Sequence, residues 1–380
     1  MWLYILIILI PLVFFFNKKQ EYDHSVLFLS VFIILITTFI GIADMLGGYD
    51  RYIYGELFDD VAGNLRNGNL FWSFIFVEYP KELGYDYLNV AIALLTQNRY
   101  IFILILTIII YILTFVSFKK YMSNYPFALI LFLALMFFFT FTYLRQILSV
   151  SISWLAIQYI IDRKKWKFIL VIAIAFLFHN SALILVPFYF LPAKKYNVQS
   201  VIIIMIVCLA IGATGITNTL YQAYGGLSES EERTADYVES SGFRVAYMIE
   251  AAFFLYLILS NYKRIPNDKT RIVLCNMSLT FCGILLFFIK SENGGRLSWF
   301  YMIGLISTLT YLSQSIKLRT SQFNTIVLSV SFFLFLRILT QWSFSLYPYK
   351  TFFTNGHRKY DPVYEKYEYD YNYDDDKFYK

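Results

Sequence analysis

Long apolar runs separated by short polar segments recur along most of the chain. Runs of about twenty apolar residues with few charges are typical of transmembrane helices, and these runs lack the alternation of membrane β-strands. An open sheet would also leave backbone groups unsatisfied in lipid. The apolar segments are 2–16, 25–43, 100–118, 125–141, 143–161, 167–191, 198–213, 245–260, 271–289, 296–314 and 322–341. The pattern predicts an all-α, polytopic integral membrane helical bundle.

Composition agrees with a membrane chain, because 58% of the 380 residues are hydrophobic and only 15% are charged. The net charge of +6 does not indicate nucleic-acid binding. Its basic residues lie in short loops, where they set orientation in the membrane. Cys208, Cys275 and Cys282 lie in apolar segments without metal-site spacing, so we expect them to be packing residues.

Clusters of lysine and arginine predict which loops face the cytoplasm. The clusters are 18–19, 119–120, 163–167, 194–195, 263–271 and 317–319. The N-terminus, 44–99, 141–145, 214–244, 290–295 and the tail are then predicted to lie outside. Two of these outer segments are acidic: 44–99 holds eight Asp or Glu against four Lys or Arg, and 214–244 holds five against two.

Segment 167–191 does not fit a simple alternation of sides, because basic clusters flank both of its ends. As one helix it would extend roughly 37 Å, too short for two crossings of a hydrocarbon core about 30 Å thick. One interpretation is a re-entrant pair with His179 at its tip, lining a protein cavity. The other is a single long crossing that leaves Lys194 and Lys195 outside. The re-entrant interpretation leaves about ten full crossings.

The sequence predicts a membrane domain at 1–342, with outer loops at 44–99 and 214–244, and a Tyr- and Asp-rich tail at 343–380. Segment 87–97 is apolar but too short to span a bilayer, so we expect an interfacial helix there.

Arg145 and His179 lie in segments that lipid would otherwise surround. A guanidinium in hydrocarbon costs roughly 2.5–3.5 kcal/mol on insertion scales, so such a residue is paired or faces a watery cavity. Arg145 offers a planar fork of donors that suits phosphate oxygens; the alternative is a snorkelling arginine. Histidine titrates near neutral pH, which makes His179 a candidate general base. The alternative is a satisfied core histidine.

Three further arginines are candidates for holding an anion. Arg296 follows two glycines at the start of a helix, where backbone N–H groups can bind a phosphate. Arg244 precedes the apolar segment 245–260 at the same predicted level. Arg337 lies inside the last apolar segment and needs an acidic partner or a phosphate there.

The outer segment 44–99 combines acids with aromatic rings, as carbohydrate sites do. Asp50 and Tyr52 lie in one such stretch, and Glu82 and Tyr85 lie in another. The alternative is a solvated loop with aromatic residues at the headgroup level.

Five short stretches together resemble the EpsG-like branch of the Wzy-type polysaccharide polymerases. They are Gly48–Tyr52 with Tyr54, Glu82–Tyr85, Tyr143–Gln146, Phe178–Leu183, and Arg296 at the start of a late helix. Their order and spacing cover about 45–315. The family usually has an arginine upstream of its Gly-x-Asp stretch, whereas no arginine precedes Asp50 here.

The resemblance implies a GT-C-like glycosyltransferase in a bacterial plasma membrane, with its active site facing outward. Such enzymes join oligosaccharide repeat units carried on undecaprenyl diphosphate, by inverting transfer without a metal or other cofactor. Arg145 and Arg296, with Arg244 and Arg337, would bind the diphosphate. His179 or Asp50 would deprotonate the acceptor hydroxyl. Tyr52, Glu82 and Tyr85 would contact the glycan.

The implied partners are the lipid-linked donor and acceptor, the bilayer, a chain-length regulator and a flippase, and no nucleic acid. Three other functions stay open at this point. A flippase would also gather arginines around a diphosphate, although with cationic residues throughout the bundle. A glycan ligase of related design would differ only in its acceptor. A purely structural membrane protein would not need charges at the outer ends of its helices.

Overall fold

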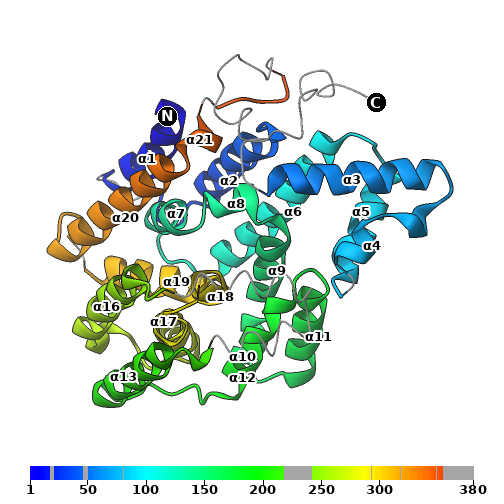
Figure 1. Ribbon diagram of the computed structural model, residues 1–380. Coiled ribbons are helices and arrows are strands. Elements are labelled where there is room, and N and C mark those ends of the chain that lie inside the picture. Colours follow the sequence, from blue (N-terminus) through cyan, green and yellow to red (C-terminus); the bar gives the residue numbers. More distant parts are fainter. Residues whose placement is uncertain are drawn as a thin grey trace. The chain divides into compact units, whose positions relative to one another are not determined.

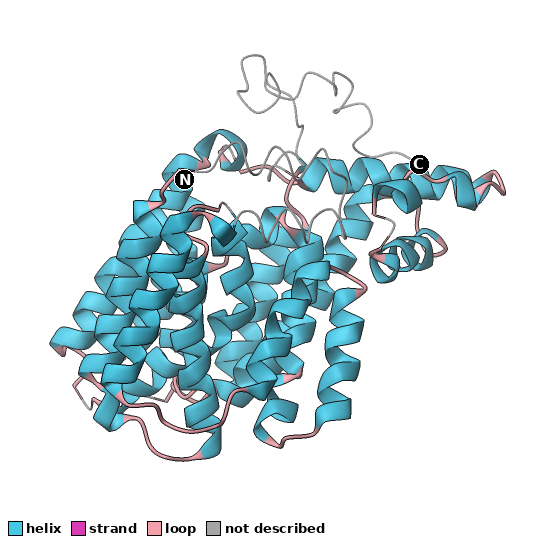
Figure 2. Ribbon diagram, turned by 60° about the horizontal axis from the view of Figure 1, so that its bottom comes forward, coloured by secondary structure: helices cyan, strands magenta, loops and turns pink. Residues whose placement is uncertain are grey.

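The computed structural model describes residues 1–17, 21–45, 50–79, 81–217, 242–291, 293–316, 318–347 and 349–353. Within these ranges all regular structure is helical except one isolated β-bridge between Ala43 and Thr351 (Figure 2). Four helical stretches are long and apolar enough to cross a membrane: Arg99–Tyr121, Leu144–Ile161, Lys269–Phe287 and Gln322–Gln341. Several shorter apolar helices accompany them. The prediction of an all-α membrane chain is therefore confirmed at this level.

The observed helices follow the predicted apolar segments closely. They are α1 (Trp2–Phe15), α2 (Val26–Gly41), α6 (Arg99–Tyr121), α7 (Tyr125–Leu135), α8 (Phe139–Thr142), α9 (Leu144–Leu155), α10 (Ile157–Ile161), α11 (Lys165–Phe176), η3 (Asn180–Leu185), α12 (Val186–Phe190), α13 (Val198–Thr214), α16 (Val245–Ser260), η4 (Tyr262–Arg264), α17 (Lys269–Phe287), α18 (Asn293–Ser298), η5 (Trp299–Tyr301), α19 (Met302–Ser315), α20 (Gln322–Gln341) and α21 (Ser343–Leu346). Segment 125–141 is the main difference, because it breaks into α7 and α8 after Leu135.

The chain forms two compact units, described separately here. The first contains Met1–Ser151, Leu177–His179 and the chain from Arg319 onward, and the second contains Ile152–Phe176 and Asn180–Leu318. In the first unit α7 packs against α1 and α20 (Figure 1). Phe138 and Phe335 join α20 to the end of α7, with ring centroids 4.9 Å apart. Asp23 and Arg319 form an ion pair at 2.5 Å.

Segment 44–99, which the sequence predicted to be an outer loop, is largely helical in its described residues. It contains α3 (Arg51–Arg66), η2 (Leu70–Trp72), α4 (Ile75–Glu78) and α5 (Leu83–Ala93). Tyr54, Phe58 and Val61 recur at helical spacing on the buried face of α3, and many charges on its other face obscure that pattern. The predicted interfacial helix at 87–97 begins four residues earlier, at Leu83.

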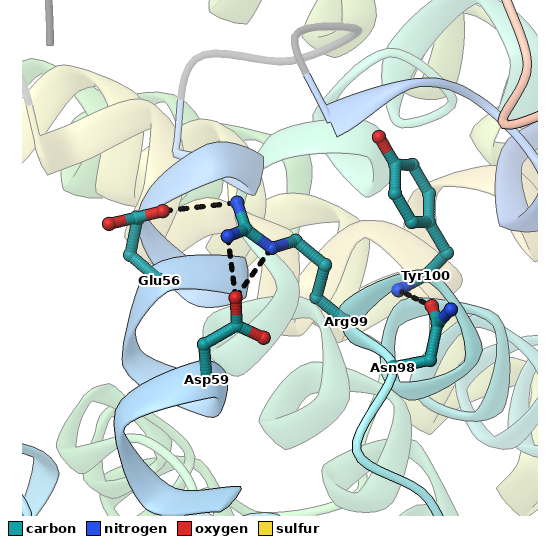
Figure 3. A network of polar contacts seen from close by, with 5 residues as sticks. All are labelled: Glu56, Asp59, Asn98, Arg99 and Tyr100. Atoms are coloured by element: carbon teal, nitrogen blue, oxygen red, sulfur yellow. Dashed lines mark hydrogen bonds and ion pairs between the residues drawn. The ribbon is translucent and has the colours of Figure 1, made fainter. Parts of the chain in front are cut away.

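Arg99 fastens α3 to the start of α6. Its Nε donates to Asp59 at 2.8 Å and its Nη1 donates to Glu56 at 3.0 Å, both from successive turns of α3 (Figure 3). Asn98 caps α6 by accepting from the backbone N–H of Tyr100 at 2.8 Å. These charge-assisted hydrogen bonds attach α3 to the start of α6, which is long enough to span a membrane.

Arg51 closes the other end of α3. It is fully buried, and its Nη2 donates to the carbonyls of Ile40 (2.9 Å), Gly41 (3.3 Å) and Ala43 (3.0 Å) at the end of α2. Burial lowers the pKa of Arg51 to about 10, so the guanidinium stays charged at neutral pH. A cation at the C-terminus of a helix also interacts favourably with the helix dipole.

The beginning of the predicted tail packs on this same place. Tyr349 stacks on Phe39 with ring centroids 4.2 Å apart and donates its hydroxyl to the Phe39 carbonyl at 2.7 Å. The remaining tail residues, 354–380, lie outside the described residues, as do Gly48, Tyr49 and 218–241 of the second outer loop.

In the second unit α17 is central and contacts α13, α16, α18 and α19 (Figure 1). One close approach is at Gly304 of α19. A Cβ added there would overlap Met277 and lie 2.8 Å from the Leu274 carbonyl oxygen. Ser278 and Thr308 share a hydrogen bond of 2.7 Å across the same helix pair. Small residues at a crossing allow two helices in lipid to pack closely.

Segment 165–191 folds back on itself. Arg163, just before α11, donates to the carbonyls of Tyr189 (2.6 Å) and Leu191 (2.7 Å) at the far end of the segment. The rings of Phe168 and Tyr189 stack at 4.8 Å. Two limbs therefore run side by side, which favours the folded-back alternative over one long helix.

This folding back gathers three basic clusters at one end of the second unit. Arg163 lies beside Leu191, and Lys195 donates to the carbonyl of Ile265 at 2.7 Å. Lys194 follows within the same connection and its carbonyl accepts from Asn276 at 3.1 Å. The loops 163–167, 194–195 and 263–271, which the sequence predicted to lie on one side of the membrane, are therefore close together in this unit.

We predict that Gly304→Ala destabilises the protein, because the added methyl group must push apart two packed helices. Overpacking of this kind typically costs about 1–3 kcal/mol. Gly63→Ala is the matched control, since nothing lies within 4 Å of the added Cβ, and there we expect no loss or a gain of about 0.4–1 kcal/mol. Thermal unfolding midpoints in detergent measure both. Equal midpoints for Gly304→Ala and wild type would contradict the packing.

Candidate functional site

Arg145 lies at the start of α9, directly after the turn at Tyr143. Its side chain is only 13% exposed and forms an ion pair with Glu82, which caps α5 and is itself buried. The prediction that Arg145 would be paired or face a cavity is met by this acidic partner. A buried guanidinium with a carboxylate is far less costly than an unpaired one.

Three tyrosines surround the guanidinium. Its Cζ lies 3.5 Å from the ring centroid of Tyr79, 5.8 Å from that of Tyr54 and 5.9 Å from that of Tyr85. Aromatic faces within about 6 Å attract a cation. Burial raises the pKa of all three hydroxyls, so the rings are neutral. We call these five residues, Arg145, Glu82, Tyr54, Tyr79 and Tyr85, the Arg145 cage.

The cage has unused hydrogen-bonding capacity. Among the described residues, the Nε of Arg145 is buried without a hydrogen-bond partner, and so are both carboxylate oxygens of Asp86. Asp86 follows Glu82 by four residues, which places both acids on one face of α5. Orphaned polar atoms of this kind are costly and are often found where function requires them.

The environment of Asp86 favours its neutral form. Burial, and then the charge of Glu82, raise the pKa of Asp86 to about 7, whereas Arg145 acts in the opposite direction. The charge of Asp86 also acts on Tyr79. Arg145 is thus bonded to Glu82, and its charge also acts on Asp86.

The tip of the folded-back segment, Leu177–His179, docks against the cage. The carbonyl of Leu177 accepts from the backbone N–H groups of Gly84 (2.9 Å) and Tyr85 (3.3 Å). Gly84 permits this approach, because a Cβ there would lie 2.8 Å from Leu177 Cβ. Ser149, one turn after Arg145, donates to the carbonyl of His179 at 3.3 Å. His179 is 6% exposed.

The first unit therefore brings Arg145, Glu82, Tyr85 and His179 into one place, although they come from separate stretches of chain. Asp50 lies close to them, because its charge acts on Tyr54 and Tyr79.

Tyr52, also predicted to contact glycan, belongs to another cluster. Its ring lies 5.9 Å from the guanidinium of Arg99. Tyr52 and Tyr85 are 3% and 0% exposed, so neither ring presents a face on which a sugar can stack in this structure. Glu82 is engaged with Arg145. In the structure, Glu82 and Tyr85 hold the arginine.

Arg244 and Arg296 belong to the second unit. The N–H of Arg244 donates to the carbonyl of Ile289 at 2.9 Å. Arg296 lies in α18, a helix of six residues, and its side chain is partly exposed. The glycines before it are explained by packing, because a Cβ on Gly295 would lie 2.8 Å from the hydroxyl of Tyr247.

Arg337 is on the exposed face of α20, and the described part of the chain provides no ion pair for it. The described residues therefore do not supply the acidic partner that the sequence predicted for Arg337. Arg337 lies in the first unit but makes no described contact with the Arg145 cage.

Sequence reasoning missed Tyr79 and Asp86. The sequence does contain a signal for Asp86, because Glu82 and Asp86 are four residues apart and would share one face of a helix. The sequence pattern predicts a helix from residue 87, whereas α5 begins at Leu83, so this shared face is not apparent from the sequence.

The second unit contains an apolar cavity of about 450 Å³ between the returning limb of the folded-back segment, α13 and α17. Pro187, Met205, Cys208, Phe287 and Tyr301 are among its lining residues. The hydroxyl of Tyr301 donates to the carbonyl of Ile184 at 2.6 Å.

The long apolar helices indicate the class of protein, which is a multi-pass helical membrane protein. The chain belongs to the EpsG family, whose sequence profile matches residues 26–351. Family membership indicates a membrane protein of exopolysaccharide biosynthesis and confirms the resemblance drawn from the sequence. No curated protein and no solved structure matches the chain.

We predict that Asp86→Asn flattens the pH dependence of stability. The pKa of Asp86 is about 7 in the folded protein and 3.8 for an ordinary aspartate, so the folded protein binds more protons between these two pH values. Stability should therefore fall as pH rises from about 4 to about 7 and then level off. Asparagine removes that contribution. Thermal midpoints at pH 5 and pH 8 measure it, with the exposed Glu21→Gln as control. An unchanged difference between the two pH values would contradict the assignment.

Proposed function

We propose that the protein is a polysaccharide polymerase, which joins oligosaccharide repeat units carried on undecaprenyl diphosphate at the outer face of a bacterial plasma membrane. The observation that carries the proposal is the Arg145 cage, a buried and preorganised cation beside the tip that bears His179, in a chain of the EpsG family.

Arg145 would hold the diphosphate of the donor. Its guanidinium offers several donors in one plane, and the Nε still lacks a partner among the described residues. Glu82 and the three tyrosines would keep the fork oriented, so that no reorganisation is needed as charge develops on the leaving group. With this cation the reaction is proposed to proceed without a divalent metal.

The acceptor hydroxyl would attack the anomeric carbon of the donor sugar in line with the bond to the diphosphate. The new glycosidic bond forms as the anomeric carbon–oxygen bond to phosphate breaks, and configuration inverts. Undecaprenyl diphosphate leaves with the bonding electrons. His179 or Asp50 would take the proton of the hydroxyl.

In the membrane, we propose about ten crossings in a GT-C-like bundle, with the folded-back segment 165–191 entering and leaving on the cytoplasmic side. Its limb α11 is twelve residues long, roughly 18 Å as helix, which is less than the bilayer core. The apolar cavity in the second unit would accept part of a prenyl chain, since its walls are almost entirely hydrocarbon.

Purified protein supplied with a lipid-linked repeat unit tests this function. We expect a ladder of products with increasing numbers of repeats, formed equally well in EDTA. Ladders lost in EDTA and restored by Mg²⁺ would refute the metal-independent mechanism. Transport of the lipid across vesicles without any ladder would indicate a flippase, and transfer of one repeat to a different acceptor would indicate a ligase.

We predict that Arg145→Ala abolishes the ladder. Loss of one preorganised donor to developing charge typically costs about 2.7–4 kcal/mol, or 10²–10³ in rate. Arg145→Lys should fail to restore activity, because a point charge replaces the planar fork. The exposed Arg66→Ala serves as the matched control and should leave the ladder unchanged. Substantial polymer from Arg145→Ala protein of normal thermal stability would remove Arg145 from the mechanism.

A further inference from the structure

Large apolar side chains crowd the outward face of η2, α4 and α5. Phe71 and Trp72 are 85% and 84% exposed, and Leu95 is 81% exposed. The other exposed members are Phe74, Val77, Leu83, Tyr87 and Leu94. We call these eight residues the 71–95 surface.

Ring contacts join the parts of this surface. The centroid of Phe76 lies 6.3 Å from that of Phe71 in η2 and 6.3 Å from that of Tyr87 in α5. The three short helices therefore present one connected patch and not scattered single residues. A contiguous apolar patch of this kind marks a surface that water does not cover in the working protein.

The opposite face of the same helices is fully occupied. Ile75 and Tyr85 are 0% exposed, and Tyr79, Glu82 and Tyr85 hold Arg145. The segment therefore cannot turn its apolar face inward without dismantling the cage. The described part of the chain therefore leaves this face uncovered.

Position and charge identify the partner. Leu94 and Leu95 lie four or five residues before Arg99, where α6 begins, and α6 is long and apolar enough to cross a membrane. Ile101 and Ile108 on α6 are exposed as well. The apolar surface thus continues from α5 onto the outside of a spanning helix. Tryptophan, phenylalanine and tyrosine are the side chains that suit the headgroup boundary.

We propose that the 71–95 surface is immersed in the bilayer interface, in the leaflet where α6 begins, so that this part of the outer segment lies in the membrane. Residues 70–95 contain three acids, Glu78, Glu82 and Asp86, against the single basic residue Lys81. Attraction to anionic lipid therefore contributes little, and burial of apolar area drives the insertion. The inference is independent of the polymerase activity.

Site-directed spin labelling in proteoliposomes tests this directly. Single cysteines at Trp72→Cys and Leu95→Cys are placed in a background in which Cys208, Cys275 and Cys282 are alanine. Arg66→Cys, on the exposed end of neighbouring α3, is the matched control. We expect the ratio of oxygen to nickel-chelate collision rates to be several-fold higher at 72 and 95 than at 66. The same ratios should appear with phosphatidylcholine alone and with added phosphatidylglycerol.

Nickel accessibility at 72 and 95 equal to that at 66 would overturn the proposal, because the surface would then face water. Low accessibility to both reagents would also overturn it, since another protein or a second copy would then cover the patch. Native protein offers a second measurement without cysteines. Brominated lipids should quench wild-type fluorescence more than that of Trp72→Phe, and equal quenching would contradict insertion.

Discussion

The buried ion pair between Arg145 and Glu82 is the constraint on which the arrangement of segment 70–95 depends. A guanidinium of low exposure needs a partner, and removing one member of such a pair typically costs about 3–5 kcal/mol. Here the pair also has a geometric consequence. The pair joins the start of α5 to the start of α9 and so holds these two helices in one relative position.

Backbone hydrogen bonds also hold the start of α5 in place. The first N–H groups of α5 would lack intrahelical partners, and the Leu177 carbonyl satisfies those of Gly84 and Tyr85. The broken helix of segment 165–191 supplies that free carbonyl, because its regular hydrogen bonding stops at Phe176. The free N–H groups of α5 and the free carbonyl of Leu177 thus satisfy each other. As a result, His179 is held beside Ser149, one turn after Arg145.

Segment 70–95 has two faces of different chemistry. Its inner face carries the acids and tyrosines of the Arg145 cage, and its outer face carries the 71–95 surface. If the outer face is immersed as proposed, the cage lies near headgroup depth. A diphosphate attached to a prenyl chain sits at that same depth, so the proposed donor would reach Arg145 without leaving the membrane. The stability of the cage and its access to lipid would then depend on one short segment.

The chain's own pattern determined the fold class and most of the helices, because long apolar runs in lipid have few alternatives to the helix. It also indicated Arg145 and His179, since polar groups inside such runs require a reason. The pattern did not reveal α3, because charged residues obscure its amphipathic face. It also did not reveal the start of α5, which places Glu82 and Asp86 on one face of that helix. The glycines before Arg296 indicated an anion site, whereas contact with Tyr247 accounts for them.

Local composition decides whether a stretch can be a helix, and the sequence alone determined that much here. Partner choice depends on contacts between residues far apart in the chain. The sequence left open whether segment 167–191 is one long helix or folds back, and the bonds from Arg163 to Tyr189 and Leu191 show that it folds back. Only the tertiary structure set Glu82 against Arg145, 63 positions away, because a buried charge pairs with whatever carboxylate the fold brings within reach.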